Sequence, residues 1–292
     1  MPFRNSERTL AEAIRSIELQ TFEDWELLLC DDGSSDKSAN IAGAPADPRI
    51  VVWSDGLFKA LGTRLNECID RARGVYFARM DADDICYPER IAAQVRFMKE
   101  NPEVDLMGTS MAIFGEDGVC LGKRCGPQVH ARICRTPALS FRMFHPTWLG
   151  KLSWFRRYRY KSESEDHDLL FRAYCNSTYA NLPEILHGYR EEVLDLKKIG
   201  AYRRSWYGLL GGYTSGVRGL ACRATVGGCM LCKMFLDHVA VATGLRHKLL
   251  RQRATPASAE EQARWRAVWL AVQSHAPVET RREILHGLGR AQ

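Results

Sequence analysis

The sequence lacks an uninterrupted apolar run long enough to cross a bilayer. A membrane-spanning helix needs about 20 mostly apolar residues, and the best candidate, residues 224–245, is broken by Lys233, Asp237 and His238. No secretory signal and no internal repeat can be found in the 292 residues. We therefore expect a globular protein of the cytoplasm rather than a transmembrane, secreted or repeat protein.

A matched set of zinc ligands is also lacking, although the sequence contains ten cysteines. Cys229 and Cys232 form a CxxC pair, and Cys120, Cys125 and Cys134 lie close together. A zinc site would need a second matched pair or nearby histidines, and none accompanies them. We interpret the cysteines as reduced thiols in the core and loops.

Acidic residues are almost missing from residues 197–253, where eleven Lys and Arg accompany a single acid, Asp237. Aromatic side chains such as Trp206 and Phe235 are interleaved with this positive charge. Such a segment suits the surface of an anionic membrane, although a solvated basic face over a helical core would give the same pattern. No nucleic-acid-binding motif accompanies it, so we expect no nucleic acid partner.

Strand and helix patterns alternate along the first part of the chain. Strands are predicted at residues 25–30, 50–53, 75–80 and 179–186, and helices at residues 10–17, 61–69, 88–98 and 166–174. This alternation predicts an α/β fold with a mostly parallel sheet that is covered by helices on both faces. Beyond residue 195 the pattern is helical, so we predict a main domain, 1–195, and a helical basic extension, 196–292.

The first strand of such a sheet is predicted to be lacking. A helix capped by Asn5 or Ser6 should follow a strand, but only residues 1–4 precede it, too few for a core strand. In doubly wound sheets the first strand is usually central. We therefore expect that the natural chain starts upstream and that Met1 is an internal methionine.

Asp81, Asp83 and Asp84 form a cluster of carboxylates just after a predicted strand. Residues i and i+2 of an extended segment point to the same side, so Asp81 and Asp83 can face one cation. Mg²⁺ and Mn²⁺ prefer oxygen ligands and often bind substrate phosphates as well. The alternative is an acidic helix start, with Asp83 or Asp84 capping a helix near Pro88.

Two further acidic clusters flank this one in the sequence. Asp31 and Asp32 end a strand before a Gly-Ser turn, where carboxylates can bind a ribose or a base N–H, although Asp-Gly is also an ordinary turn sequence. Glu165 and Asp166 open a helix. Asp166 would suit a general base, while the helix dipole explains acids at a helix start without any catalytic role.

The ordered set of motifs resembles the family 2 glycosyltransferases of the GT-A fold. The resemblance covers about residues 1–190 and depends on the runs MPFRN at 1–5, DDGSSD at 31–36, ARMDADD at 78–84, EDHDLLFR at 165–172 and LPEIL at 182–186. Each motif is unspecific by itself, and the specificity comes from their order. The QxxRW motif of processive synthases is absent near residues 202–206, which favours transfer of single sugars.

The resemblance implies a role for each motif. Asp81 and Asp83 would bind ribose, diphosphate and a divalent metal, Mn²⁺ or Mg²⁺, with Asp83 the more direct ligand. Asp166 would deprotonate the acceptor hydroxyl, with Glu165 beside it and His145 as a further candidate for contact with phosphate or metal. The residues that would hold the nucleoside are Pro2, Phe3, Asn5, Asp31 and Asp32.

The implied function is metal-dependent, inverting transfer of a sugar from a nucleotide-diphosphate sugar to a glycan or lipid-linked acceptor, in bacterial surface polysaccharide synthesis. We expect a UDP-linked donor, acceptor contacts within residues 115–161, and a peripheral place at the inner face of the membrane. A sugar nucleotidyltransferase is one alternative, but no Gly-rich loop with Arg or Lys is visible near the N-terminus. The other is a non-catalytic fragment that binds membrane or a partner.

Overall fold

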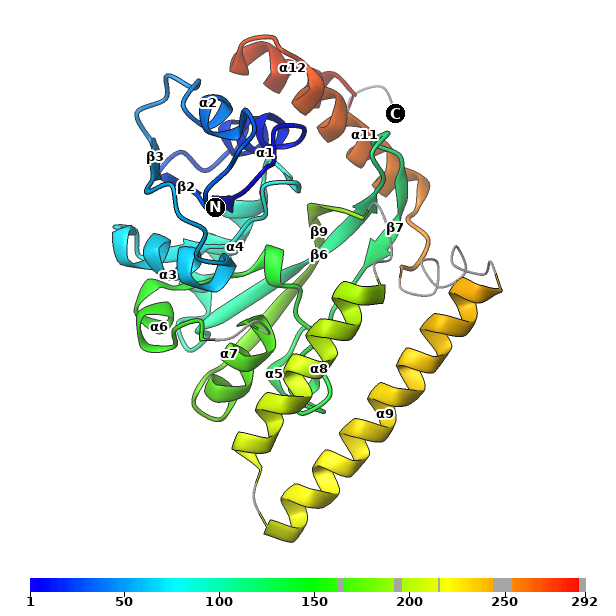
Figure 1. Cartoon of the computed structure of the whole chain (residues 1–292). Coiled ribbons are helices and arrows are strands. Elements are labelled where there is room, and N and C mark those ends of the chain that lie inside the picture. The colour runs from blue at the N-terminus through cyan, green and yellow to red at the C-terminus, as the bar shows by residue number, and fades with distance from the viewer. Residues whose placement is uncertain (162–164, 192–195, 215, 244–253, 289–292) are drawn as a thin grey trace.

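The computed structural model describes residues 1–161, 165–191, 196–214, 216–243 and 254–288. Figure 1 shows a body of strands and helices, a long helical hairpin on one side, and a second helical pair on the other. The first elements are β1 (Pro2–Phe3), α1 (Leu10–Glu18), β2 (Leu27–Asp31), α2 (Ser38–Ala42), β3 (Ile50–Ser54), α3 (Leu61–Arg71), β4 (Tyr76–Ala78), β5 (Ile85–Cys86) and α4 (Arg90–Glu100).

The second half of the body completes the sheets, and further helices follow it. The later body elements are β6 (Leu106–Phe114), β7 (Cys120–Arg124), α5 (His130–Ile133), β8 (Leu149–Lys151), α6 (Leu152–Arg157), α7 (Glu165–Ala173) and β9 (Tyr179–Arg190), with 3-10 turns at His145–Thr147 and Tyr174–Asn176. The helices after them are α8 (Leu196–Tyr213), α9 (Gly216–Ala242), α11 (Ala259–Gln273) and α12 (Val278–Leu288).

The strands of the described residues form two sheets. The first has the order β1-β2-β3 and is parallel throughout. The second has the order β4-β8-β6-β9-β5, with β7 paired to β6. Its long central pair, β6 and β9, is parallel and its other pairs are antiparallel. The predicted α/β class and helical C-terminal region are confirmed, and the second sheet is mixed.

The strand predicted to be lacking is present in a shortened form. Pro2 and Phe3 pair in parallel with Cys30 and Asp31 at the edge of the first sheet, and Met1 is buried beside them. Residues 1–4 were expected to be too few for a core strand, and the structure gives them a strand of two residues at the edge of the sheet. That the natural chain starts upstream stays a prediction.

The helix predicted at residues 10–17 is present as α1, but its predicted cap is not. Neither Asn5 nor Ser6 caps α1, which begins at Leu10 after Thr9. Asn5 has a positive φ of 50°, and its backbone N–H donates to Ser34 Oγ (3.1 Å). The Ser6 N–H donates in turn to Ser38 Oγ (2.7 Å). Asn5 thus binds the turn after β2 and Ser6 binds the start of α2, which sequence spacing could not show.

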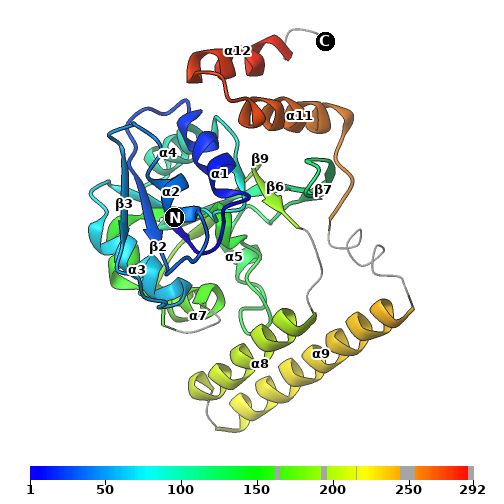
Figure 2. The ribbon, with the colours of Figure 1, turned by 45° about the horizontal axis from the view of Figure 1, so that its top comes forward.

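The helices α8 and α9 form an antiparallel hairpin that extends away from the sheets (Figures 1 and 2). Arg203 of α8 and Asp237 of α9 pair at 2.7 Å, and Trp206, Leu210 and Val226 form the apolar core of the hairpin. Part of the predicted basic segment, residues 244–253, lies outside the described residues.

The sequence pattern indicated that no segment could span a bilayer, but one helix meets the criteria of length and composition. Gly219–Ala242 is long and apolar enough, and only 11% of its most apolar window is buried. The many Ala, Val, Cys and Leu residues keep the mean hydropathy of the helix high despite its three polar residues. A helix of this kind is weak evidence of a span, because soluble helices can pass the same test.

Helix α11 packs into the core of the body. Trp265 is 1% exposed and lies in one apolar cluster with Ile85, Phe114 and Ile185. Ser258 and Glu261 form a capping box at the start of α11. Helices α11 and α12 both lie in the region beyond residue 195 that was predicted to be helical. The predicted domain division after residue 195 stays a prediction.

Candidate active site

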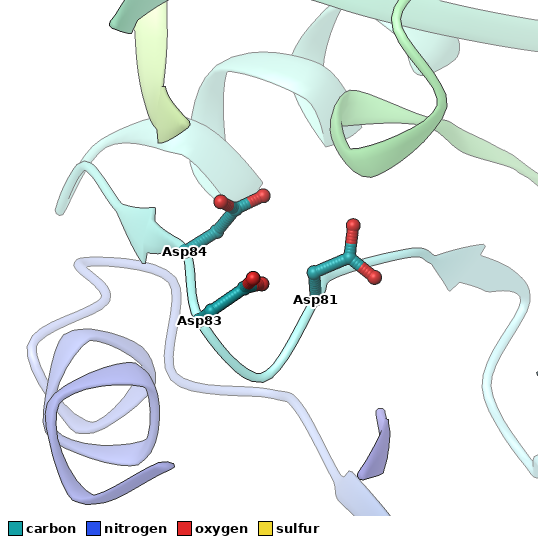
Figure 3. A group of neighbouring side chains, drawn as sticks. All are labelled: Asp81, Asp83 and Asp84. Atoms are coloured by element: carbon teal, nitrogen blue, oxygen red, sulfur yellow. The ribbon is translucent and has the colours of Figure 1, made fainter. Parts of the chain in front are cut away.

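The loop between β4 and β5 brings three carboxylates together. Oxygen atoms of Asp81, Asp83 and Asp84 all lie within 4.8 Å of one another. Figure 3 shows Asp81 and Asp83 on the two arms of the loop, with Asp84 where the chain enters β5. Like charges this close destabilise one another unless a proton or a cation is added. Neither Asp83 nor Asp84 caps α4, since that helix begins at Arg90 without a side-chain cap.

Asp84 is held by strand β9 rather than directed at a ligand. It is fully buried; its Oδ2 lies 2.8 Å from His187 Nε2, and its Oδ1 accepts the Arg190 N–H (3.0 Å). Arg90 Nη1 donates to His187 Nδ1 (3.1 Å), so the ring proton is on Nε2 and is donated to Asp84. Burial raises the pKa of Asp84 and lowers that of His187 well below its usual value.

Asp81 and Asp83 are the carboxylates that remain for a cation. Asp81 forms an ion pair with the buried Arg79, whose Nε has no hydrogen-bond partner among the described residues. Asp83 is exposed on one side, but the loss of water to the protein atoms around it, with the charges of Asp84 and Asp81, raises its pKa to about 7. Clustered carboxylate oxygens are suitable ligands for Mg²⁺ or Mn²⁺, so the donor set fits a divalent metal.

A cavity of about 490 Å³ lies beside this loop. Its walls are residues 2–9, 36 and 81–83. It therefore brings together five of the residues predicted to bind the nucleotide-sugar, which are Pro2, Phe3, Asn5, Asp81 and Asp83. We call it the donor cavity.

Asp31 and Asp32 do not line the donor cavity. The carboxylate of Asp31 accepts the Ser34 N–H (2.9 Å) and the Ser54 hydroxyl (2.9 Å). Asp32 Oδ1 accepts hydrogen bonds from the Lys59 N–H (2.7 Å) and from Arg64 Nε (2.8 Å). Both carboxylates are buried and have protein partners, and their predicted contact with a nucleoside stays a prediction.

The third acidic cluster, which begins at Glu165, lies close enough to Arg79 and Asp81 for their charges to act on it. Burial is the main cause that raises the pKa of Glu165 to about 7, and the charges of Arg79 and Asp81 also act on it. His145, which is buried, lies 3.0 Å from the Tyr160 hydroxyl through its Nε2. Burial and the charge of Arg79 keep the pKa of His145 well below its usual value, so it is neutral. A neutral imidazole can coordinate a metal, but it has no positive charge with which to attract a phosphate. The neutral state of His145 therefore favours contact with a metal over contact with phosphate.

Helix α8 contacts three successive residues of the acidic motif on α7. The Tyr202 hydroxyl donates to Asp166 Oδ1 (2.7 Å), the same oxygen that accepts the His167 N–H (2.8 Å). The His167 ring stacks on Trp206 with 3.9 Å between ring centroids. The Tyr213 hydroxyl donates to Asp168 Oδ1 (2.5 Å).

Sequence reasoning missed the contact that Tyr202, Trp206 and Tyr213 make with α7. They stand at positions i, i+4 and i+11 of one helix, and this spacing places them on one helical face. A line of aromatic residues at helical spacing in an otherwise unassigned tail could have indicated a contact surface. Nothing in the sequence shows that this surface meets α7.

Comparisons with known proteins find relatives of this chain. The model of glycosyl transferase family 2 matches residues 1–162. Over 200 residues the chain is 36% identical to a putative glycosyltransferase of Bacillus subtilis, EpsE, covering 66% of this chain and 72% of EpsE. Over 128 residues it is 31% identical to WfgD of Escherichia coli, a UDP-Glc:alpha-D-GlcNAc-diphosphoundecaprenol beta-1,3-glucosyltransferase, covering 44% of this chain and 50% of WfgD.

Solved structures with low sequence identity share the fold. TarS of S. aureus in complex with UDP-GlcNAc superimposes with a TM-score of 0.59 at 17% identity, covering 100% of this chain and 90% of that chain. The mannosyltransferase PcManGT of Pyrobaculum calidifontis, in complex with GDP-Man and Mn²⁺, gives a TM-score of 0.56 at 13% identity, covering 98% and 83%. At these identities the likeness shows a GT-A glycosyltransferase fold.

Proposed function

The chain belongs to glycosyl transferase family 2, and from this premise we propose that it moves a single sugar from a UDP-linked donor to a hydroxyl of a glycan or lipid-linked acceptor, with inversion, in surface polysaccharide synthesis. The main support is the donor cavity, in which Asp81 and Asp83 meet residues 2–9. The UDP-linked donor in the name of WfgD and the UDP-GlcNAc bound to TarS support the choice of nucleotide.

Asp83 and Asp81 would hold the divalent metal. When bound, Mn²⁺ or Mg²⁺ neutralises negative charge on the nucleoside diphosphate. The Mn²⁺ in the PcManGT complex supports this assignment. Arg79 orients Asp81 through their ion pair, and Asp84 anchors the loop to β9 through His187, so the chain holds the loop in place before any ligand arrives.

Asp166 is the proposed general base. Its carboxylate would take the proton of the acceptor hydroxyl while that oxygen attacks the anomeric carbon from the face opposite the nucleotide. The bond from this carbon to the diphosphate oxygen breaks, the nucleoside diphosphate leaves with the electron pair, and the configuration is inverted. Two donors, the Tyr202 hydroxyl and the His167 N–H, hold Oδ1 of this carboxylate. A fixed carboxylate keeps its second oxygen in a constant direction, which favours proton transfer.

Nucleotide binding is the direct test of this function. We expect the melting temperature to rise when Mn²⁺ and UDP are added together, because a ligand at about 100 times its dissociation constant contributes about 2.7 kcal/mol to stability. Asp83→Ala should abolish this shift. Asp24→Ala, at an exposed position distant in sequence from the loop, should keep it. A cooperative melt without any shift for UDP, GDP or dTDP would contradict donor binding.

The hairpin supports a peripheral contact with an anionic membrane at its cytoplasmic face. Large apolar side chains are exposed along α9, with Leu220, Leu231 and Phe235 each more than 65% accessible. Lys233 is exposed between them. Apolar and cationic groups on one helix are typical of proteins that bind the interface of anionic lipids.

Vesicle binding tests the membrane contact. We expect the protein to sediment with phosphatidylglycerol vesicles at low salt and to be released at about 1 M salt, where the screening length falls to about 3 Å. Phe235→Ser should weaken binding, whereas Val75→Ser, at a position of similar exposure in the body, should not. Binding that is absent, or unchanged by salt, would exclude the electrostatic contact.

A further inference from the structure

A second cavity, of about 350 Å³, lies where α7, α8 and α9 meet. His167 of α7, Tyr202 and Trp206 of α8, and Met230 and Lys233 of α9 are among its walls. None of the residues that line the donor cavity lines this one. We propose that it binds the lipid-phosphate end of the acceptor, an inference that rests on the proposed function and names its acceptor class. We call it the acceptor cavity.

The position of the acceptor cavity is the first argument. Tyr202 lines it and donates a hydrogen bond to Asp166, the carboxylate proposed to take the acceptor proton. His167, the next residue in the chain, lines it as well. A molecule held there by its lipid end would therefore have its sugar beside Asp166, which is what a lipid-linked acceptor requires.

The chemistry of the walls is the second argument. Leu139, Trp206 and Met230 supply apolar surface, while Arg203 and Lys233 supply positive charge. Arg203 is paired with Asp237, and Lys233 is exposed. Apolar surface with cations at its side matches a molecule that carries both a hydrocarbon chain and a phosphate. The volume lies within the usual range of small-molecule sites, about 300–1,000 Å³.

The location of the walls relative to the exposed face of α9 is the third argument. Met230 and Lys233 are neighbours in sequence of Leu231 and Phe235, which are 69% and 67% exposed. One helix thus carries both a wall of the cavity and an apolar surface suited to a bilayer. A lipid chain could pass from the bilayer to the cavity along a single helix.

Two cysteines of α9 allow a direct test. Cys229 lines the acceptor cavity, whereas the exposed Cys232 does not. With farnesyl diphosphate as the probe, in EDTA to prevent metal-dependent binding at Asp83, the rate of maleimide labelling at Cys229 should fall about tenfold at about ten times the dissociation constant. Labelling at Cys232, followed by peptide mass spectrometry, should be unchanged.

Matched variants and ligands decide the outcome. Lys233→Glu should abolish the protection of Cys229, and Arg204→Glu, at an exposed position that does not line the cavity, should keep it. Protection that survives in Lys233→Glu, or equal protection by farnesol or by dihexanoyl phosphatidylglycerol, would overturn the assignment. The assay needs no turnover, so lack of protection beside an intact UDP-dependent melting shift would overturn the acceptor cavity while the proposed function stands.

Discussion

Asp166→Asn is expected to lower kcat by about 10²–10⁴, the usual contribution of a general base. The amide keeps the shape of the side chain and can still accept hydrogen bonds from Tyr202 and His167 at its oxygen. The fold and the donor cavity should therefore be intact. The measurement is transfer of labelled sugar from the nucleotide-sugar to a lipid extract, together with the UDP-dependent melting shift, which should not change.

Two companion variants make this result specific. Tyr202→Phe removes one of the two donors to Asp166 Oδ1 and should lower kcat less than Asp166→Asn, with little change in KM for the donor. Glu165→Gln tests the neighbouring carboxyl, whose pKa of about 7 makes it the competing base. If Asp166→Asn stays active and Glu165→Gln does not, the base is Glu165.

Trp265→Ala is expected to lower the free energy of unfolding of the whole chain by about 3–5 kcal/mol, the range for a large aromatic residue removed from a core. The centroid of the indole ring lies 4.5 Å from that of the Phe114 ring, and the indole Nε1–H donates to the Gly118 carbonyl (2.8 Å). A Cβ at position 188 of strand β9 would lie 2.2 Å from the nearest atom of this ring. Only glycine therefore fits at position 188. Urea denaturation measures the loss.

The size of this loss decides whether α11 belongs to the body. Leu231→Ala, on the exposed face of α9, is the control and should change stability by less than about 0.5 kcal/mol, as surface substitutions usually do. If the C-terminal helices folded as a separate unit, Trp265→Ala would instead produce an early transition of its own and leave the main one in place.

Much of the donor side of the site could be predicted from the sequence. The carboxylates at 81, 83 and 84 are adjacent in the chain, so their proximity depends only on local backbone geometry. The strands that precede Asp31 and Asp81 are short apolar runs, which are recognisable without a structure. The role of Asn5 and Ser6 could not be predicted, because both bind residues about 30 positions away instead of capping α1.

What the sequence by itself determined about this protein is the type and order of its acidic motifs, and with them its fold class and family. The tertiary structure alone decided how each carboxylate is used. Asp84 is bound by His187, 103 residues away, and Asp166 by Tyr202, 36 residues away, while α11 joins the core through a tryptophan 147 residues from its hydrogen-bond partner. Such pairs form only when packing brings distant segments together, because spacing along the chain records local geometry and not long-range contacts.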